Sequence, residues 1–169
     1  MTRRRAVLAA AVVAVAAVAA AGCGYRLGPG DPVAGARTVA LPVFDNRTFR
    51  RGVELDLARV LASEVHARTR LSVVDAGADL VVRGVITAID EDVLSQRIGE
   101  VIRESAVLVT VEVTVVDGRT GETLVPRTLI TERESFVPAI GESLRSARAE
   151  TLRRLAADVV DRLEAPDRP

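Results

Sequence analysis

The sequence predicts an α+β domain in which two helices pack on one face of a mixed, mainly antiparallel sheet of about four to five strands. Three observations lead to this prediction. Five valines alternate with other residues from Val107 to Val115, the period-two pattern of a strand with one buried face. Residues 53–68 and 142–163 instead carry apolar side chains at helical spacing. The resulting order, β-α-β-β-β-α, favours both helices covering one side of the sheet.

The first half of the domain has the pattern of a strand, a helix and a short strand. Residues 38–44 predict the first strand, and Pro42 suits the edge of a sheet. We expect three apolar side chains to share one of its faces: Val39, Leu41 and Val43. The helix over 53–68 has acidic residues in its first turn, where the helix dipole favours them. Its apolar stripe consists of Leu57, Val60, Leu61 and Val65. A strand over 71–74 would complete a right-handed parallel unit.

The second half has the pattern of three longer strands followed by a helix. The third strand is expected over residues 79–90, with one face formed by Leu80, Val82, Gly84, Ile86 and Ala88. The polar stretch 117–122 separates two apolar runs and predicts a hairpin. A fifth strand follows over 123–134, where Pro126 indicates an edge position or a bulge. The apolar stripe of the last helix consists of Leu152, Leu155, Ala156, Val159, Val160 and Leu163.

The N-terminus has the pattern of an export signal. Three arginines precede an apolar run from Ala6 to Ala21 that is too short and too rich in alanine for a good membrane span. Gly22-Cys23 after small residues is similar to a bacterial lipobox, which implies acylation of Cys23 and a permanent membrane tether. Cleavage after Ala21 would instead leave a soluble protein with a free thiol. We divide the chain into a signal peptide (1–22), a lipidated cysteine and linker (23–37), a domain (38–165) and a tail (166–169).

The composition argues against several classes of protein. Cys23 is the only cysteine, so disulfides and cysteine-based metal sites are excluded. His66 is the only histidine, near the end of a helix, and is expected to be solvated or to cap that helix. No nucleophile elbow, phosphate loop or dinucleotide fingerprint is present. Four aromatic residues are too few for stacking on nucleic acid. We therefore expect no enzyme activity, cofactor, metal or nucleic-acid partner.

Several short motifs together resemble the LptE family of lipopolysaccharide-assembly lipoproteins. Residues 23–27 read Cys-Gly-Tyr-Arg-Leu, similar to the family's opening after the lipidated cysteine. Residues 39–48, Val-Ala-Leu-Pro-Val-Phe-Asp-Asn-Arg-Thr, followed by Gly-Val-Glu at 52–54, resemble its first strand and loop. Further similarities are Ala-Asp-Leu at 78–80, Gly84-x-Ile86 and Asp117-x-x-Thr120-Gly121.

This resemblance implies a non-enzymatic lipoprotein at the periplasmic face of the outer membrane. Family members plug a large outer-membrane β-barrel, LptD, assist its assembly and bind lipopolysaccharide. Gly24 after the cysteine, rather than Asp, suggests the same sorting here. Curli-secretion lipoproteins and activators of penicillin-binding proteins share the first strand and loop, and they form the alternative reading. The hairpin over residues 93–102 and the Gly-Tyr opening favour the LptE family.

The resemblance also points to candidate ligand-binding residues. Arg97 and Gly99 resemble a basic-residue-then-glycine hairpin that the family associates with substrate contact; the alternative is a solvated hairpin tip. Arg47, Arg50 and Arg51 form a basic loop that is either solvated or in contact with phosphate or the barrel wall. Guanidinium groups bind phosphate as bidentate donors. The lipid A phosphates of lipopolysaccharide are therefore the expected ligand of these arginines.

Overall fold

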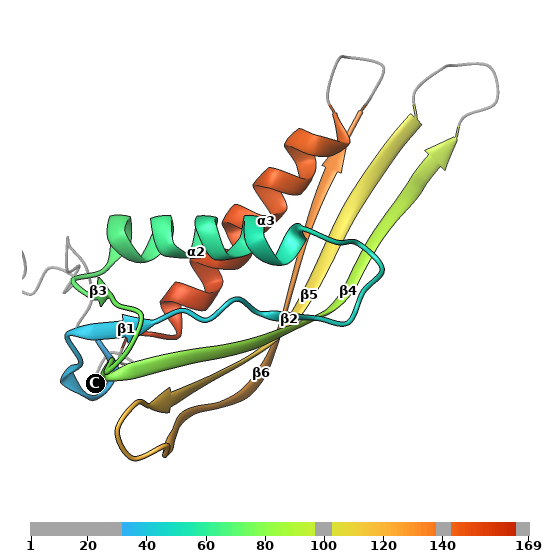
Figure 1. Ribbon diagram of the computed structural model, residues 1–169. Coiled ribbons are helices and arrows are strands. Elements are labelled where there is room, and N and C mark those ends of the chain that lie inside the picture. Colours follow the sequence, from blue (N-terminus) through green and yellow to red (C-terminus); the bar gives the residue numbers. More distant parts are fainter. Residues whose placement is uncertain (1–31, 97–102, 138–142, 165–169) are drawn as a thin grey trace, which may run out of the picture.

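A computed structural model describes residues 32–96, 103–137 and 143–164 of the 169-residue chain (Figure 1). A short 3-10 turn, η1, opens this part at Val33–Gly35. In chain order the further elements are β1 (Thr38–Ala40), β2 (Asp45–Asn46), α2 (Val53–Arg68), β3 (Ser72–Val73), β4 (Leu80–Gln96), β5 (Arg103–Asp117), β6 (Thr123–Phe136) and α3 (Leu144–Asp161).

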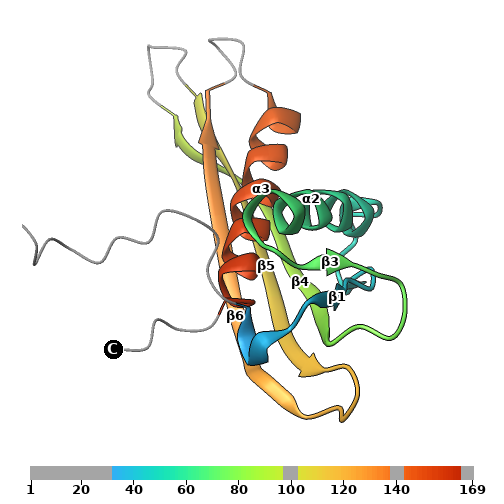
Figure 2. The same ribbon diagram turned by 90° about the vertical axis from the view of Figure 1, so that its left-hand side faces the viewer.

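The six strands form one mixed sheet in the order β3-β1-β4-β5-β6, with β2 paired to β4 beside this path. The three long strands β4, β5 and β6 are antiparallel, whereas the short strands β1, β2 and β3 pair in parallel. Figure 2 shows α2 and α3 on the same side of this sheet. The predicted fold class is confirmed. The sheet has six strands rather than four to five because the expected first strand, 38–44, forms only at Thr38–Ala40 and a separate short strand, β2, follows at Asp45–Asn46.

Pro42 lies where the first strand is interrupted. β1 pairs with the start of β4 through Val39 and Leu80, and β2 pairs further along through Asn46 and Ile86. Residues 41–44 between them belong to neither strand; Pro42 could donate no ladder hydrogen bond there. The predicted face is wrong at Val43, which is 51% exposed. The interruption breaks the period-two alternation and buries Phe44 instead.

Phe44 enters the core through space left by Gly84 on β4. A Cβ atom added to Gly84 would lie far inside contact distance of the Phe44 ring. The strand therefore accepts an aromatic ring at this point only because its residue has no side chain. This close approach fixes where the chain between β1 and β2 runs along β4.

A bulge in β4 changes the face on which its later residues lie. The register with β5 shifts between Ile86 and Ala88, so that Ala88 pairs with Thr110 and Ile89 pairs with Val109. Ile89 packs against the core, whereas Ala88 shares the helix-free face with Thr110. The expected position of Ala88 on the core face is wrong because the extra residue reverses the alternation.

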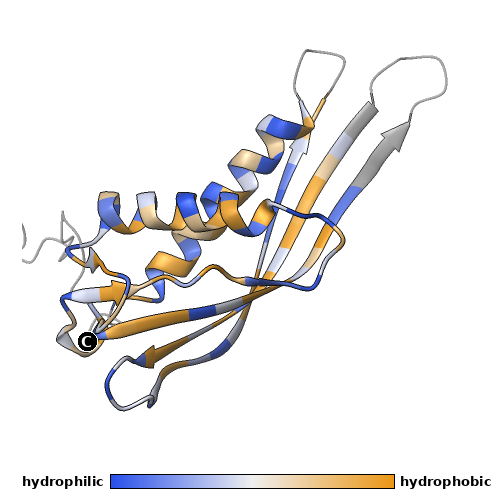
Figure 3. Cartoon of the chain, viewed as in Figure 1, coloured by the Kyte–Doolittle hydropathy of each residue, from blue (hydrophilic) through white to orange (hydrophobic). Residues whose placement is uncertain are grey.

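The core lies between the sheet and the two helices. The five alternating valines of β5, Val107 to Val115, are at most 2% exposed, and the predicted α3 stripe is buried along its whole length. α2 has the predicted bounds; three of its four predicted stripe residues are buried, and Val60 packs against the core from its rim. α3 begins at Leu144, where the Ser143 hydroxyl accepts the N–H of Ser146 at 3.1 Å. Figure 3 shows apolar residues along β4 and β5.

The hairpin of β5 and β6 forms as predicted, and β6 is an edge strand. The Asp117 N–H donates to the Glu122 carbonyl at 2.8 Å, and the register shifts near Pro126. Beside β6 the helix α3 makes polar contacts, including Arg154 with Glu134 at 2.8 Å. Burial and the adjacent carboxylate of Asp158 raise the pKa of Glu132 in this seam.

We predict that Gly84→Ala destabilises the domain by about 1–3 kcal/mol, the usual cost of overpacking a filled core. The added methyl group would meet the Phe44 ring, so Gly84→Ala combined with Phe44→Leu should recover part of the loss. Chemical denaturation of both variants and of Phe44→Leu alone measures the coupling. Strictly additive effects would contradict the contact.

Candidate functional site

The basic loop, residues 45–52, begins with β2, leads into α2 and is organised by one side chain, that of Asn46. Its Nδ2 donates to the Arg50 carbonyl and to Glu54 Oε2, both at 2.7 Å. Its Oδ1 accepts the N–H of Thr48 at 2.8 Å and the Thr48 hydroxyl at 2.7 Å. Asn46 thereby holds both ends of the loop, the local bonding for which asparagine is favoured in turns.

Further contacts tie the basic loop to its neighbours. The Arg47 N–H donates to the Ile86 carbonyl at 3.0 Å, which fixes the start of the loop to β4. Gly52 adopts φ +89° just before α2, a conformation that favours glycine. Hydrogen bonds from the Glu54 N–H and from the Asn46 amide lower the pKa of Glu54, with a smaller contribution from the charge of Arg51. Glu54 therefore stays ionised as the acceptor for Asn46.

The three predicted arginines of this loop have different surroundings. Arg50 Nη2 lies 2.9 Å from Glu91 Oε2, and the other oxygen of Glu91 lies 2.8 Å from Arg148 Nη2 on α3. Arg50 thus links the loop to β4 and, through Glu91, to α3. Among the described residues, the exposed guanidinium groups of Arg47 and Arg51 form no hydrogen bond or ion pair. They are free to meet a ligand.

The other predicted site residues fall outside the described part of the chain. Arg97 and Gly99 belong to residues 97–102, and Cys23 belongs to residues 1–31. The structure therefore brings together only the three arginines of the basic loop. Lipidation of Cys23 and ligand contact by Arg97 stay predictions.

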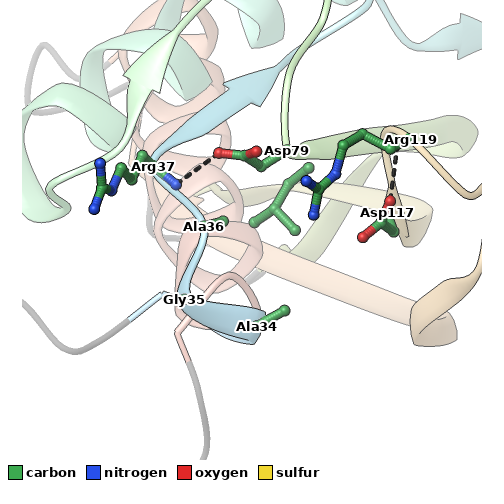
Figure 4. A pocket seen from close by; sticks show the side chains of 8 residues that line it. Ala34, Gly35, Ala36, Arg37, Asp79, Asp117 and Arg119 are labelled. Carbon is green, nitrogen blue, oxygen red and sulfur yellow. Dashed lines mark hydrogen bonds between the residues drawn. The ribbon is translucent and has the colours of Figure 1, made fainter.

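A shallow cavity of about 160 Å³ lies at the start of β4, away from the basic loop (Figure 4). Asp79 Oδ2 accepts the N–H groups of Arg37 and Thr38 at 2.9 and 3.2 Å and the Thr38 hydroxyl at 3.0 Å. These bonds, led by the Arg37 N–H, lower the pKa of Asp79, and the nearby charge of Arg119 adds to the effect. Asp79 is already bonded by the chain that enters β1, so its role at this cavity is structural: it joins that chain to the start of β4.

The described residues offer no sign of metal binding or of a helical membrane span. In 32–96, 103–137 and 143–164, no group of three or more His, Cys, Asp or Glu residues could hold a metal ion. No helix in those ranges is long and apolar enough to cross a bilayer. His66 is exposed, as expected, and its Nδ1 lies 2.7 Å from the Ala62 carbonyl oxygen.

Two features of the basic loop were not singled out from the sequence. Phe49, at its tip, is 102% exposed, although large aromatic side chains are normally at least partly buried. In the sequence, this exposure was indicated by an aromatic residue among three arginines in a polar loop. The second is Asn46-x-Thr48: besides belonging to the family motif, asparagine followed by threonine two residues later is a turn-forming pattern.

Comparison with protein families identifies a match over most of the chain. The family model described as "LptE: Lipopolysaccharide-assembly" matches residues 36–165, which include every described strand and helix from β1 to α3. No curated protein matches the chain significantly in sequence.

Several solved structures share the fold at low sequence identity. A hypothetical protein from Chlamydia trachomatis has a TM-score of 0.56 and 13% identity, over 75% of this chain and 94% of that one. A minor lipoprotein from Acinetobacter baumannii has a TM-score of 0.52 and 14% identity, over 76% and 96%. A protein from Xanthomonas campestris has a TM-score of 0.54 and 10% identity, over 80% and 88%. These similarities support the fold alone.

We predict that Asn46→Ala loosens the basic loop and lowers the free energy of unfolding by about 1–2 kcal/mol. The substitution removes hydrogen bonds that contribute about 1 kcal/mol each, and less where they are exposed to solvent. Hydrogen exchange of the Thr48 amide should accelerate, because its acceptor is lost. The Asp117–Glu122 turn, which Asn46 does not touch, is the internal control and should keep its exchange rate. Unchanged protection at Thr48 would contradict the assigned role of Asn46.

Proposed function

The chain belongs to the LptE lipopolysaccharide-assembly family, and from that premise we propose that it is an outer-membrane lipoprotein with two roles. It fills and helps assemble a lipopolysaccharide-transporting β-barrel, and it binds lipopolysaccharide on its way to the surface. The match over residues 36–165 carries this proposal. The family consists of assembly lipoproteins and not of enzymes. The absence of any catalytic motif in the sequence is consistent with that role.

In this proposal, Cys23 carries the acyl chains that hold the domain at the periplasmic face of the outer membrane. A single acyl chain binds a membrane only marginally, whereas several chains anchor a protein stably. The linker expected from the sequence, residues 23–37, would form the tether. The lipobox-like sequence supports this arrangement.

We place the contact with lipopolysaccharide on two basic segments. The first is the hairpin that contains Arg97 and Gly99, at the end of β4. The second is the basic loop, where Arg47 and Arg51 are exposed and Arg50 is also bonded to Glu91. Guanidinium groups form strong charge-assisted bonds with phosphate, and lipid A presents phosphate groups.

Mild detergent extraction and pull-down of the full-length chain, tagged at its C-terminus, tests the partner. We expect a large, heat-modifiable β-barrel to be recovered with the wild-type protein and with a lipidated control carrying Arg83→Gln, a substitution on the helix-free face. Recovery of a peptidoglycan synthase or of a ring of identical subunits would instead support the alternative lipoprotein classes.

For the ligand, we predict that Arg97→Asp weakens binding of lipopolysaccharide by about tenfold or more, because a hydrogen bond to a charged group contributes about 1.5–3 kcal/mol. Its effect on stability should stay within about half a kcal/mol, as for other surface substitutions. Titration with purified lipopolysaccharide and thermal melting measure the two effects. The control is Val111→Asp, which buries an unpaired charge among the β5 valines and should unfold the domain.

An Arg97→Asp variant that melts and titrates like the wild type would remove this residue from the proposed binding site. The basic loop would then be the remaining candidate on this chain.

A further inference from the structure

Beyond its pairing with β2, the strand β4 has a long free edge. β1 pairs with the start of β4, and β2 pairs with Val85 and Ile86. The Arg47 N–H then donates to the Ile86 carbonyl at 3.0 Å. β4 continues to Gln96, and among the described residues no strand pairs with this continuation on the side away from β5. Figure 1 shows this part of β4 at the outer border of the sheet.

The middle of this free edge is a regular strand. The register with β5 shifts before Ala88 and again after Val93, so residues 88–93 pair with β5 without interruption between two bulges. A strand with one unpaired side presents a row of backbone N–H and C=O groups at the spacing of an adjacent strand. An extended polypeptide supplies matching donors and acceptors, whereas a lipid chain or a free phosphate does not. The edge therefore fits a polypeptide strand.

The two ends of the sheet carry features that oppose the addition of a strand. β3, at one end, has two residues. β6, at the other end, contains Pro126 and an inward-pointing charge, since Glu132 pairs with the buried Val109. Very short strands, prolines and inward-pointing charges are the usual protection of sheet edges. Residues 88–93 contain no proline and are as long as an ordinary strand.

The charged side chains of this stretch differ between its two faces. Glu91 lies on the helix-covered face, where Arg50 and Arg148 approach it to 2.9 and 2.8 Å. Asp90 lies on the helix-free face, is exposed, and forms no ion pair among the described residues. The base in the same cross-strand row, Arg133, is on β6, roughly 10 Å away across two strand spacings. Asp90 is therefore the carboxylate available to a neighbouring strand.

A second copy of this chain does not fit this edge. Two-fold pairing of the edge with itself, centred on residues 88–93, places either Asp90 or Glu91 on the axis, opposite the same residue of the second copy. Like charges directly opposite each other are destabilising. Asp45 and Arg47, both exposed at the start of the free edge, offset each other in charge. The edge therefore selects a different chain, with a basic side chain opposite Asp90.

We propose that residues 88–93 of β4 are a docking site for an extended segment of another protein, which adds a strand to the sheet and places a basic side chain beside Asp90. Backbone hydrogen bonds to β4 supply the affinity, and the charge of Asp90 supplies the selectivity. The occupant is a polypeptide, so this site is separate from the proposed lipopolysaccharide contacts and does not depend on the proposed function.

The test titrates the full-length lipidated protein, in neutral detergent, with peptides of about six residues, an ordinary strand length. One alternates arginine and threonine, one has the same sequence with methylated backbone nitrogens, and one alternates glutamate and threonine. The arginine peptide should bind and slow the hydrogen exchange of amides within residues 88–93. The methylated peptide cannot donate ladder hydrogen bonds and should bind about tenfold more weakly, or less.

A charge reversal at the edge tests the selectivity. Asp90→Arg should weaken binding of the arginine peptide by about tenfold and should bind the glutamate peptide instead, because like charges in contact are costly. The matched control is Asp75→Arg, which makes the same change in net charge at an exposed residue after β3, at the far end of the sheet. It should bind all three peptides like the wild type. Both variants should melt like the wild type because both side chains are exposed.

Equal binding of the plain and the methylated arginine peptides would overturn the inference, since the contact would then be charge attraction alone. Equal effects of Asp90→Arg and Asp75→Arg, or no binding of the arginine peptide, would also overturn it. Dimerisation of the wild type with slowed exchange at residues 88–93 would assign the edge to a second copy instead. None of these results bears on the proposed function, which the barrel pull-down and the lipopolysaccharide titration test separately.

Discussion

Five valines on one face of β5 are covered by α2 and α3 and bordered by β4 and β6. Full burial of a valine contributes on the order of 1.5–3 kcal/mol, so this row alone supplies about 10 kcal/mol as an upper estimate. That is comparable to the entire net stability of an ordinary domain. The positions of both helices, and hence of the loop that starts α2, depend on this buried strand. Of the three phenylalanines, Phe44 and Phe136 pack with the core, and Phe49 does not.

Patterns that one element contains in itself were predictable from the sequence. The bounds of α2, the buried valines of β5 and the Asp117–Glu122 turn all follow from local periodicity or turn chemistry. The failures arise where a single residue interrupts the period. The expected first strand ends at Ala40, before Pro42, and the bulge after Ile86 moves Ala88 to the opposite face. Neither interruption changes the composition of its segment, so the alternation appears continuous in the sequence.

Prediction of the candidate site was limited by contacts between distant residues. The ion pair of Arg50 with Glu91 joins residues 41 positions apart, and that of Glu91 with Arg148 joins residues 57 positions apart. Nothing local distinguishes Arg50 from Arg47 and Arg51, which have no such partner in the described part of the chain. The order imposed by Asn46, by contrast, comes from bonds within eight residues, so a local turn pattern was present in the sequence although it was not used for prediction. The predictions for Cys23 and Arg97 concern residues outside the described ranges.

β4 connects the parts of the molecule to which a function is assigned. Its first residue follows Asp79, which holds the chain entering β1; Gly84 receives Phe44; and Glu91 binds Arg50 of the basic loop. The strand continues from Glu91 to Gln96, about 17 Å at the usual rise per residue, and leads directly to the segment with Arg97. Both proposed lipid contacts are therefore attached to one strand whose register is fixed by β5. Attachment to one rigid strand favours simultaneous contact with one ligand, since the second contact then requires little additional ordering.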